Sequence, residues 1–486
     1  MSESNKKGNF YITTTLPYVN AEAHLGHAME FVRADVIARY KKLQGFDVFF
    51  NTGTDEHGMK LYEGAKKEGK TPQEYVDFYA NKFKELLKLL GISEDVHSIR
   101  TTDEAHIKAA QAFWTKVNNN GYIYKKNYKA KYCVGCEEVK TDSELVDGKC
   151  PLHPNRELEI IEEENYFFKY SAFGERLLDL YEKNPDIVIP NFRLNEMKEF
   201  AKSGLQDFSI SRLKSKMPWG IEVPGDPEHI MYVWFDALVS YIATLGYPNM
   251  EDDFKKYWVE GETVQYCGKD NNRFQSAMWQ AMLIAADLPN TKHIIVNGFI
   301  TGEGGIKMSK SLGNVVDPKD LIAEYGTDAL RYFVLREVNP FEDSPFTIER
   351  FKDSYNAGLA NGVGNLVSRV MKMANSNLSN PIGKTANFVD TPETFRSALD
   401  NFDIQRASHE VWDMIANADK KIQETQPFKL VKTDPESGKK IIADLVYEVS
   451  VIAQCLSILL PETSSKISSC IEKNSMPETP LFVRKD

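Results

Sequence analysis

Two histidines, His24 and His27, stand where a strand is expected to give way to a helix. The β-branched and aromatic run at residues 10–14 predicts the strand, and residues 26–44 predict a helix that ends at a glycine. A helix N-terminus attracts anions through its free N–H groups and its partial positive charge. Two imidazole rings there could add donors for a triphosphate. Taken alone, these residues fit a capped helix with two partly exposed histidines equally well.

A second element that could bind phosphates lies far along the chain. Lys307 and Lys310 enclose Met308 and Ser309, and they follow a glycine-rich turn at residues 301–305. A mobile loop with two ammonium groups could close over phosphates, although loops rich in Lys and Ser are usually only solvated. The histidines and the lysines together therefore indicate a nucleotide site more strongly than either pair does alone.

Three cysteines and a histidine have the spacing of a metal site. Cys133 and Cys136 are separated by two residues, thirteen residues follow, and Cys150 and His153 are again separated by two. Two such turns can complete a tetrahedron around Zn²⁺, for which three thiolates and one imidazole are a preferred ligand set. All four positions would be filled, so we expect a structural rather than a catalytic ion. The alternative is four unrelated reduced residues.

Composition limits the class of protein. A chain of 486 residues suggests about three domains, and a net charge of −11 argues against indiscriminate binding of polyanions. Basic residues at 124–131 and at Arg212, Lys214 and Lys216 could guide an RNA end or be a solvated face. The start of the chain lacks the apolar core of a signal peptide, and residues 445–460 look too short and too polar to span a bilayer. We expect a cytoplasmic protein with no membrane contact.

Alternation of strands and helices predicts an α/β domain interrupted by an insertion of about 110 residues. Residues 47–53 predict a second strand, after which Asp55 could either hold an ammonium group or cap a helix. After the insertion, residues 231–236 predict a buried strand, followed by a helix at 237–245. Further strands are expected at 264–267 and 293–296, with a helix at 273–286 between them.

The last third of the chain predicts an all-α domain. From about residue 351 we expect four or five amphipathic helices, with breaks near residues 380–381, at Pro392, at Pro427 and at 433–438. Asn365 and Arg369 are four residues apart and should share one helix face, where they could simply lie on a wet surface.

Four motifs give the chain a resemblance to a known family. These are Leu16-Pro17-Tyr18 leading into His24-Leu25-Gly26-His27, the single Cys/Cys/Cys/His knuckle, residues 232–237 (Tyr-Val-Trp-Phe-Asp-Ala) and residues 307–311 (Lys-Met-Ser-Lys-Ser). From about residue 9 to the last helices the chain resembles the methionyl-tRNA synthetases, a family of class I aminoacyl-tRNA synthetases.

The resemblance implies an α/β fold with a Rossmann-type parallel-sheet catalytic domain, a zinc-knuckle insertion and an all-α helical-bundle anticodon-binding domain. It divides the chain into five parts. The first half of the catalytic domain is expected at 1–117, the connective insertion at 118–229, the second half of the catalytic domain at 230–299, the lysine loop with a stem-contact segment at 300–350, and the anticodon-binding domain at 351–486.

The resemblance also implies roles for individual residues. Catalysis would depend on His24, His27, Lys307 and Lys310, and ATP with Mg²⁺ would be bound by His24, Gly26, His27, Gly268, Asp270 and Lys310, with Arg212 nearby. Methionine would be bound by Leu16, Tyr18, Asp55, Trp234, Ala237, Leu238, Tyr241, Phe274 and Trp279, although aromatic residues at this spacing are more often simply core. The CAU anticodon of tRNA(Met) would be read by Asn365, Arg369 and Phe428, and Zn²⁺ would be held by Cys133, Cys136, Cys150 and His153. A monomer is expected.

Several positions depart from the commoner family pattern. Asn271 and Gln275 differ from the residues usual in this part of the methionine site, and Asn297 stands where a histidine is frequent. Phe428 replaces a tryptophan that usually stacks on an anticodon base; a phenylalanine can still stack, with less area and no indole donor.

Three other interpretations stay open at this point. One is another class I synthetase, for leucine, valine, isoleucine or cysteine, although those for branched residues usually carry a much larger insertion. Another is a catalytically inactive tRNA-binding paralogue, against which the intact histidines and lysines count. The third is a small nucleotidyltransferase of the same superfamily, which would lack so large a helical tail.

Overall fold

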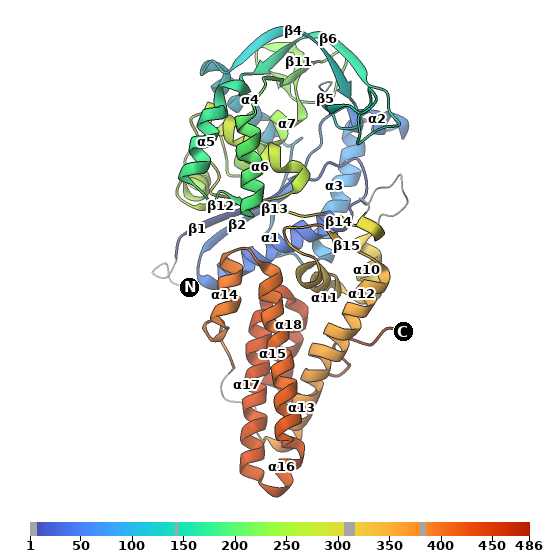
Figure 1. Cartoon of the computed structure of the whole chain (residues 1–486), viewed down its shortest axis with the longest axis vertical. Coiled ribbons are helices and arrows are strands. Elements are labelled where there is room, and N and C mark those ends of the chain that lie inside the picture. Colours follow the sequence, from blue (N-terminus) through green and yellow to red (C-terminus); the bar gives the residue numbers. More distant parts are fainter. Residues whose placement is uncertain (1–6, 141–143, 306–315, 380–384) are drawn as a thin grey trace. The chain divides into compact units, whose positions relative to one another are not determined.

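The computed structural model describes residues 7–140, 144–305, 316–379 and 385–486. The chain forms two compact units (Figure 1). The first unit contains Met1–Glu22, Phe46–Glu85 and Asp95–Val296, and the second contains Ala23–Gly45, Leu86–Glu94 and Asn297–Asp486.

A six-stranded sheet is the centre of the first unit. Its order is β3-β2-β1-β12-β13-β7, and β1 pairs in parallel with β2 on one side and with β12 on the other. The strands are β1 (Asn9–Thr14), β2 (Asp47–Thr54), β3 (His97–Arg100), β7 (Val188–Ile189), β12 (Glu262–Gly268) and β13 (His293–Asn297). Strands buried on both faces carry apolar runs, which is why β1, β2, β12 and β13 are recognisable in the sequence. The sequence did not predict β3, which is mostly polar and partly exposed, or β7, which has only two residues. The predicted parallel sheet is confirmed.

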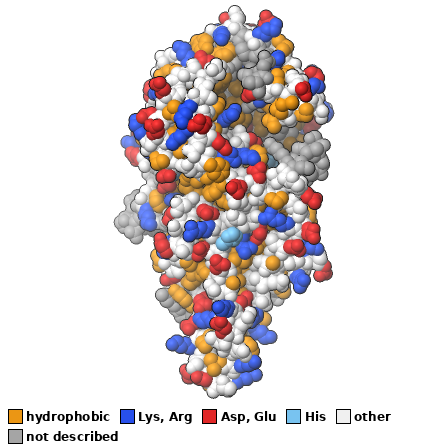
Figure 2. Space-filling view, viewed as in Figure 1, with side chains coloured by type: hydrophobic (Ala, Val, Ile, Leu, Met, Phe, Trp, Pro, Cys, Tyr) orange, Lys and Arg blue, Asp and Glu red, His pale blue; other side chains and the backbone are white. Residues whose placement is uncertain are grey.

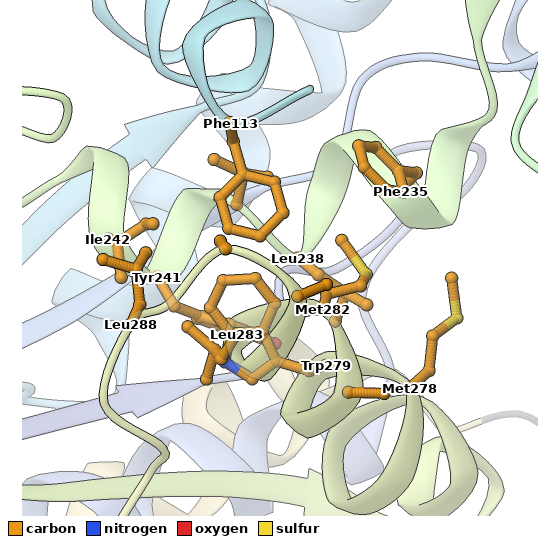
Figure 3. Packing of buried hydrophobic residues seen from close by; sticks show 14 of the residues in the cluster. Phe113, Phe235, Leu238, Tyr241, Ile242, Met278, Trp279, Met282, Leu283 and Leu288 are labelled. Atoms are coloured by element: carbon orange, nitrogen blue, oxygen red, sulfur yellow. The ribbon is translucent and has the colours of Figure 1, made fainter. Parts of the chain in front are cut away.

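Helices of the first unit enclose an aromatic core. They are α4 (Glu104–Asn119), α5 (Gly174–Lys183), α6 (Asn191–Lys202), α7 (Val233–Ala237), α8 (Ser240–Ala243) and α9 (Trp279–Ala285). The unit also contains α2 (Met59–Lys67) and α3 (Pro72–Leu89) up to Glu85. Helix α4 buries residues three and four apart, so that Phe113 lies against Phe235 and Trp279 at ring-centroid distances of 5.9 and 5.7 Å (Figure 3). Trp279, with 0% of its surface exposed, is the anchor of this core.

Two antiparallel sheets belong to the chain between the two halves of the parallel sheet. One has the order β5-β4-β6-β8, in which β4 (Ile123–Cys133) pairs along most of its length with β6 (Glu159–Phe168), flanked by β5 (Glu138–Lys140) and β8 (Phe208–Ser209). The other has the order β10-β11-β9 and consists of β9 (Ser211–Leu213), β10 (Glu222–Val223) and β11 (Asp226–Met231). Most of these strands lie in the stretch predicted as an insertion, but that stretch also contains β7, which pairs in parallel with β13 in the six-stranded sheet.

The strand predicted at residues 231–236 is wrong. Strand β11 ends at Met231, and the apolar residues that follow form the short helix α7, whose cap residue Tyr232 donates its N–H to the carbonyl of Ile210. A short apolar run fits a buried helix as well as a buried strand, and its periodicity cannot separate the two. The strand before it also belongs to the small antiparallel sheet, not to the parallel one.

The second unit is helical. It contains α1 (Leu25–Gln44), α10 (Pro318–Tyr325), α11 (Thr327–Tyr332) and, from residue 348 onward, α12 (Ile348–Ser354), α13 (Asn365–Asn377), α14 (Glu393–Asp400), α15 (Ile404–Thr425), α16 (Pro427–Thr433), α17 (Pro435–Leu459) and α18 (Pro461–Glu472). The described residues thus hold seven α-helices there rather than four or five. Short helices such as α16, which lies between the breaks predicted at Pro427 and at 433–438, account for the difference, and α17 already begins at Pro435. The break predicted near residues 380–381 falls outside the described residues.

Buried charge links α1 to α11. The guanidinium of Arg331 lies 2.9 Å from the carboxylate of Asp35, and both side chains are fully buried. Burial alone would raise the pKa of Asp35, but Arg331 and Arg39 outweigh it and lower that pKa. Losing Asp35 would leave the buried guanidinium of Arg331 with only main-chain carbonyls of the described residues at hydrogen-bond distance, and removing one partner of a buried ion pair costs about 3–5 kcal/mol.

Helix α17 is the most apolar long helix of the described chain. Its length and composition alone would let it cross a membrane, but 61% of its most apolar window is buried inside the structure. It packs against α13, α15, α16 and α18. A helix at the core of a bundle is apolar on several faces for this reason, and we interpret α17 as such a helix.

Candidate active site and metal centre

A buried carboxylate with one unpartnered oxygen marks the first unit. Asp55 follows β2, is 6% exposed, and its Oδ1 has no hydrogen-bond partner among the described residues. Its main chain is fixed, because its N–H donates to the carbonyl of Pro17 and its carbonyl accepts from the N–H of Val19. The cap residue of α2 is Gly58, so Asp55 is not a helix cap.

The surroundings of Asp55 carry an excess of negative charge. Burial, and then the negative charges of Asp236 and Glu137, raise its pKa well above the usual range of a carboxyl group. An ammonium group placed at Oδ1 would both supply the missing hydrogen bond and compensate the charge. The arrangement therefore favours a small cationic group over an anion or an apolar group.

Aromatic rings line the neighbouring elements. Trp234 of α7 stacks on Phe274 with ring centroids 3.9 Å apart, and both are partly exposed. Tyr241 of α8 lies edge-on to Trp279 at 6.0 Å, and the side-chain amide of Gln275 donates to its hydroxyl. The other apolar residues predicted for this site, Leu16, Ala237 and Leu238, are buried.

The structure separates these predicted residues into two kinds. Trp279 is entirely core, whereas the stacked pair of Trp234 and Phe274 retains exposed ring surface that a ligand could contact. Tyr18 forms an isolated parallel bridge with Asp55, so its ring belongs to the same part of the unit.

Sequence reasoning missed a buried His–Asp–His arrangement. The carboxylate of Asp236 lies 2.7 Å from Nδ1 of His57 and 2.6 Å from Nε2 of His106. Burial would raise the pKa of Asp236, but the two histidines outweigh it and lower it. The carboxylate is thereby held rigidly beside Asp55. The aspartate in the 232–237 motif and the histidine two residues after Asp55 were the available signals.

The four predicted metal ligands come together. The sulfur and nitrogen atoms that Cys133, Cys136, Cys150 and His153 would offer all lie within 4.8 Å of one another. Cys136 Sγ is 3.5 Å from Cys150 Sγ and 3.3 Å from His153 Nδ1, and Cys133 Sγ is 3.8 Å from the same nitrogen. Bonds of about 2.3 Å to sulfur and about 2.0 Å to nitrogen put the corners of a zinc tetrahedron roughly 3.5–3.8 Å apart. The donor set and its spacing therefore fit Zn²⁺.

Close packing around this cluster supports the same interpretation. A Cβ atom at Gly135 would lie 2.4 Å from Cγ of His153, so the imidazole can reach the cysteines only because this residue is glycine.

The predicted nucleotide residues are distributed over both units. In the second unit, His24 and His27 form a reciprocal cap on α1: Nδ1 of His24 accepts from the N–H of Gly26 at 3.1 Å, and Nδ1 of His27 accepts from the N–H of His24 at 3.2 Å. Burial, and then His24, lower the pKa of His27 well below its usual value. The helix predicted to follow these histidines is confirmed.

In the first unit, Gly268 ends β12 and Asp270 is exposed in the turn that follows. Arg212, expected near a nucleotide or an RNA end, is instead buried between the rings of Tyr132 and Tyr232, each 5.0 Å away. Lys307 and Lys310 lie outside the described residues.

The residues predicted to read an anticodon lie in the second unit. Asn365 begins α13 and is exposed, whereas Arg369 donates to the carboxylate of Asp419 at 2.6 Å. Phe428 near the start of α16 is 45% exposed, so its ring face is accessible for stacking.

Comparison with known proteins identifies the class. Residues 10–159 and 153–371 match the family model described as tRNA synthetases class I (M). A methionine–tRNA ligase of Caldanaerobacter subterraneus subsp. tengcongensis is 42% identical, with 95% of this chain and 73% of the relative covered. One from Brucella suis biovar 1 is 39% identical, with 94% and 90% covered. The chain thus has the fold and sequence of a class I tRNA synthetase.

Solved structures agree with these matches. The structure of Mycobacterium tuberculosis methionyl-tRNA synthetase bound by methionyl-adenylate superposes with a TM-score of 0.89 at 33% identity, covering 98% of this chain and all of the other. The chain belongs to the methionine–tRNA ligase family of class I tRNA synthetases.

Proposed function

We propose that this chain activates methionine with ATP and transfers it to the terminal ribose of tRNA(Met). The observation that carries the proposal is the buried Asp55 carboxylate, whose Oδ1 has no hydrogen-bond partner among the residues that the structure describes, in the same unit as the stacked Trp234 and Phe274. An amino acid with a positive α-ammonium group and an apolar side chain is complementary to this combination.

Asp55 would receive the ammonium group of methionine. Without a ligand, the raised pKa of Asp55 disfavours its charged form. An ammonium group that pairs with Asp55 would stabilise the charged form, so the site is selective for a cationic ligand. The rigid carboxylate of Asp236 adds negative potential nearby without competing for the ligand, because both of its oxygens already contact histidines.

The thioether would lie among aromatic and aliphatic side chains. Sulfur makes favourable contacts with ring edges, and the flexible methionine side chain adapts to such a surface. We assign this contact to Tyr18, Trp234, Tyr241 and Phe274, lined by Leu16, Ala237 and Leu238. Trp279 would not contact the thioether itself; its ring would pack edge-on against Tyr241 and hold that ring in place (Figure 3).

ATP would be bound by His24, Gly26, His27, Gly268, Asp270, Lys307 and Lys310. The methionine carboxylate attacks the α-phosphorus, and pyrophosphate leaves in line. Negative charge develops on the phosphate oxygens, where fixed N–H donors from the histidines and ammonium groups from the lysines stabilise it. The lowered pKa of His27 keeps its ring neutral near pH 7, with one N–H to donate. Magnesium, when bound with ATP, would supply further charge neutralisation.

Zinc would have a structural role at Cys133, Cys136, Cys150 and His153, since all four positions of a tetrahedron are filled by the chain. We propose the domain limits 1–117, 118–229, 230–299, 300–350 and 351–486, with the knuckle in the second of these.

tRNA recognition would use the second unit. We propose that Asn365 and Arg369 form hydrogen bonds to the unstacked bases of a CAU anticodon and that the exposed ring of Phe428 stacks on one of them. We further propose that the protein acts in the cytoplasm as a monomer.

Exchange of labelled pyrophosphate into ATP tests the activation step. We expect the purified protein to catalyse exchange with methionine and with none of the other nineteen amino acids at comparable concentration. Exchange with leucine, valine, isoleucine or cysteine instead would identify a different class I synthetase. No exchange with any amino acid, despite binding of tRNA, would identify an inactive paralogue.

A further inference from the structure

Glu137 occupies an unusual place in the chain. It directly follows the predicted metal ligand Cys136, in the turn between β4 and β5. Its backbone has φ of 55°, a left-handed conformation that residues other than glycine adopt only when the surroundings enforce it. Its side chain is 5% exposed, although glutamate is seldom so deeply buried in proteins. Neither the buried side chain nor the left-handed backbone of Glu137 is explained by the turn alone.

The contacts of Glu137 lead away from the cysteines and into the Asp55 site. Its Oε1 accepts from the hydroxyl of Tyr18 at 3.0 Å and from the backbone N–H of Lys60 at 2.8 Å. Its main-chain carbonyl accepts from the hydroxyl of Tyr232, which caps α7 and so precedes Trp234. One residue therefore holds Tyr18, which bridges to Asp55, and Tyr232, which caps the helix that carries Trp234.

Steric fit shows how closely this junction is packed. A Cβ atom at Gly58 would lie 2.5 Å from the Tyr18 hydroxyl and 3.0 Å from both carboxylate oxygens of Glu137. Gly58 also has φ of 120°, which disfavours any side chain. The Tyr18–Glu137 hydrogen bond thus occupies the space that a side chain at residue 58 would take.

We propose that Glu137 is a positioning residue for methionine, through which the cysteine–histidine turn sets the orientation of Tyr18 and of the segment carrying Trp234. The proposal rests on the proposed function, because it concerns the same amino-acid site. Glu137 itself touches neither methionine nor ATP in this account. Its removal should therefore weaken methionine binding and leave the nucleotide contacts unaffected.

Steady-state pyrophosphate exchange, with methionine and ATP varied separately, tests the proposal. For Glu137→Ala we expect the KM for methionine to rise about tenfold. This is the change expected when the hydrogen bond from Tyr18 to the Glu137 carboxylate is lost and the effect reaches methionine only through Tyr18. The KM for ATP and kcat should stay within about twofold of wild type. Glu137→Gln, which keeps an acceptor oxygen, should restore the KM for methionine to within about threefold. Zinc content by elemental analysis should be the same in all variants.

A double-mutant cycle with Tyr18→Phe shows whether Glu137 acts through Tyr18. The double variant should have about the same KM for methionine as Tyr18→Phe alone, because the shared bond can be lost only once. If Glu137→Ala does not fold, the same measurements are made on Glu137→Gln and Tyr18→Phe. An unchanged KM for methionine in Tyr18→Phe then overturns the proposal.

Glu157→Ala is the matched control. Glu157 lies in the same insertion, and its side chain is 86% exposed in an ion pair with Lys149, so its loss should change neither constant. The proposal is overturned if Glu137→Ala leaves the KM for methionine unchanged, or if it raises the KM for methionine and the KM for ATP alike. It is also overturned if the KM for methionine of the double variant shows the full effects of Glu137→Ala and Tyr18→Phe added together as free energies. Wild-type exchange with methionine separates these outcomes from failure of the proposed function, which would show as no exchange in any variant.

Discussion

Replacing Asp55 by asparagine should abolish high-affinity binding of methionine while leaving the fold intact. The side chains have the same shape, so packing against Pro17 and Val19 is kept, and the main-chain hydrogen bonds of residue 55 do not change. The variant loses only the charge that would pair with the α-ammonium group. Removing one partner of a buried ion pair costs about 3–5 kcal/mol, which corresponds to a rise in Kd of roughly 10²- to 10³·⁵-fold.

The pH dependence of stability gives an independent check on the same residue. The pKa of Asp55 in the folded apoprotein lies above that of the unfolded chain, so the folded state binds this proton more tightly. The resulting stabilisation is complete below the unfolded pKa of about 3.9 and is lost as pH rises through the raised folded pKa. Asp55→Asn cannot ionise. It should therefore melt at a higher temperature than wild type at pH 8, and the difference should vanish in acid.

Calorimetric titration with methionine and with its analogue lacking the amino group, 4-(methylthio)butanoate, measures the pairing directly. Wild type should bind methionine far more tightly than the analogue, whereas Asp55→Asn should bind both weakly. Asp179→Asn, at an exposed position on α5, is the control and should behave as wild type. Binding of methionine by Asp55→Asn within threefold of wild type would refute the assignment.

Three further changes test other parts of the account. His27→Ala should slow methionyl-adenylate formation by about 10²–10³-fold, the range for a fixed donor to a developing charge, and a full rate of pyrophosphate exchange would remove this residue from the mechanism. Cys150→Ser should reduce zinc, measured by elemental analysis, from one equivalent to well below one and lower the Tm, since a structural ion contributes folding free energy; an unchanged zinc content would exclude the cluster. Phe428→Ala should raise the KM for tRNA in charging assays about 5- to 100-fold, for the loss of one stacked base, with exchange unaffected; equal effects on both reactions would contradict an anticodon role.

Features that depend on local spacing could be predicted from the sequence. Strands β1, β2, β12 and β13 carry apolar runs, and α1 ends at Gly45, a glycine in the left-handed conformation that is typical of helix ends. The metal cluster is also local, because two short turns bring its ligands together. In each case the information lies within about twenty residues of chain.

Features that depend on distant partners could not be predicted. The aspartate at 236 meets histidines 179 and 130 positions away in the sequence, and no spacing rule connects them. Glu137 looked like one acid among many in a charged insertion until its contact with Tyr18 was known. Residues 231–236 predict a strand, whereas residues 233–237 form a helix, because a short and mostly apolar run fits either element once it is buried.

Charging of tRNA by the purified protein tests the central claim most directly. With ATP, magnesium and labelled methionine, we expect label to become attached to the 3′-terminal ribose of a tRNA(Met) transcript with a CAU anticodon, and much less to the same transcript with the anticodon changed. Attachment of a different amino acid, or no attachment of methionine to any tRNA by a protein that holds its zinc, would contradict the account.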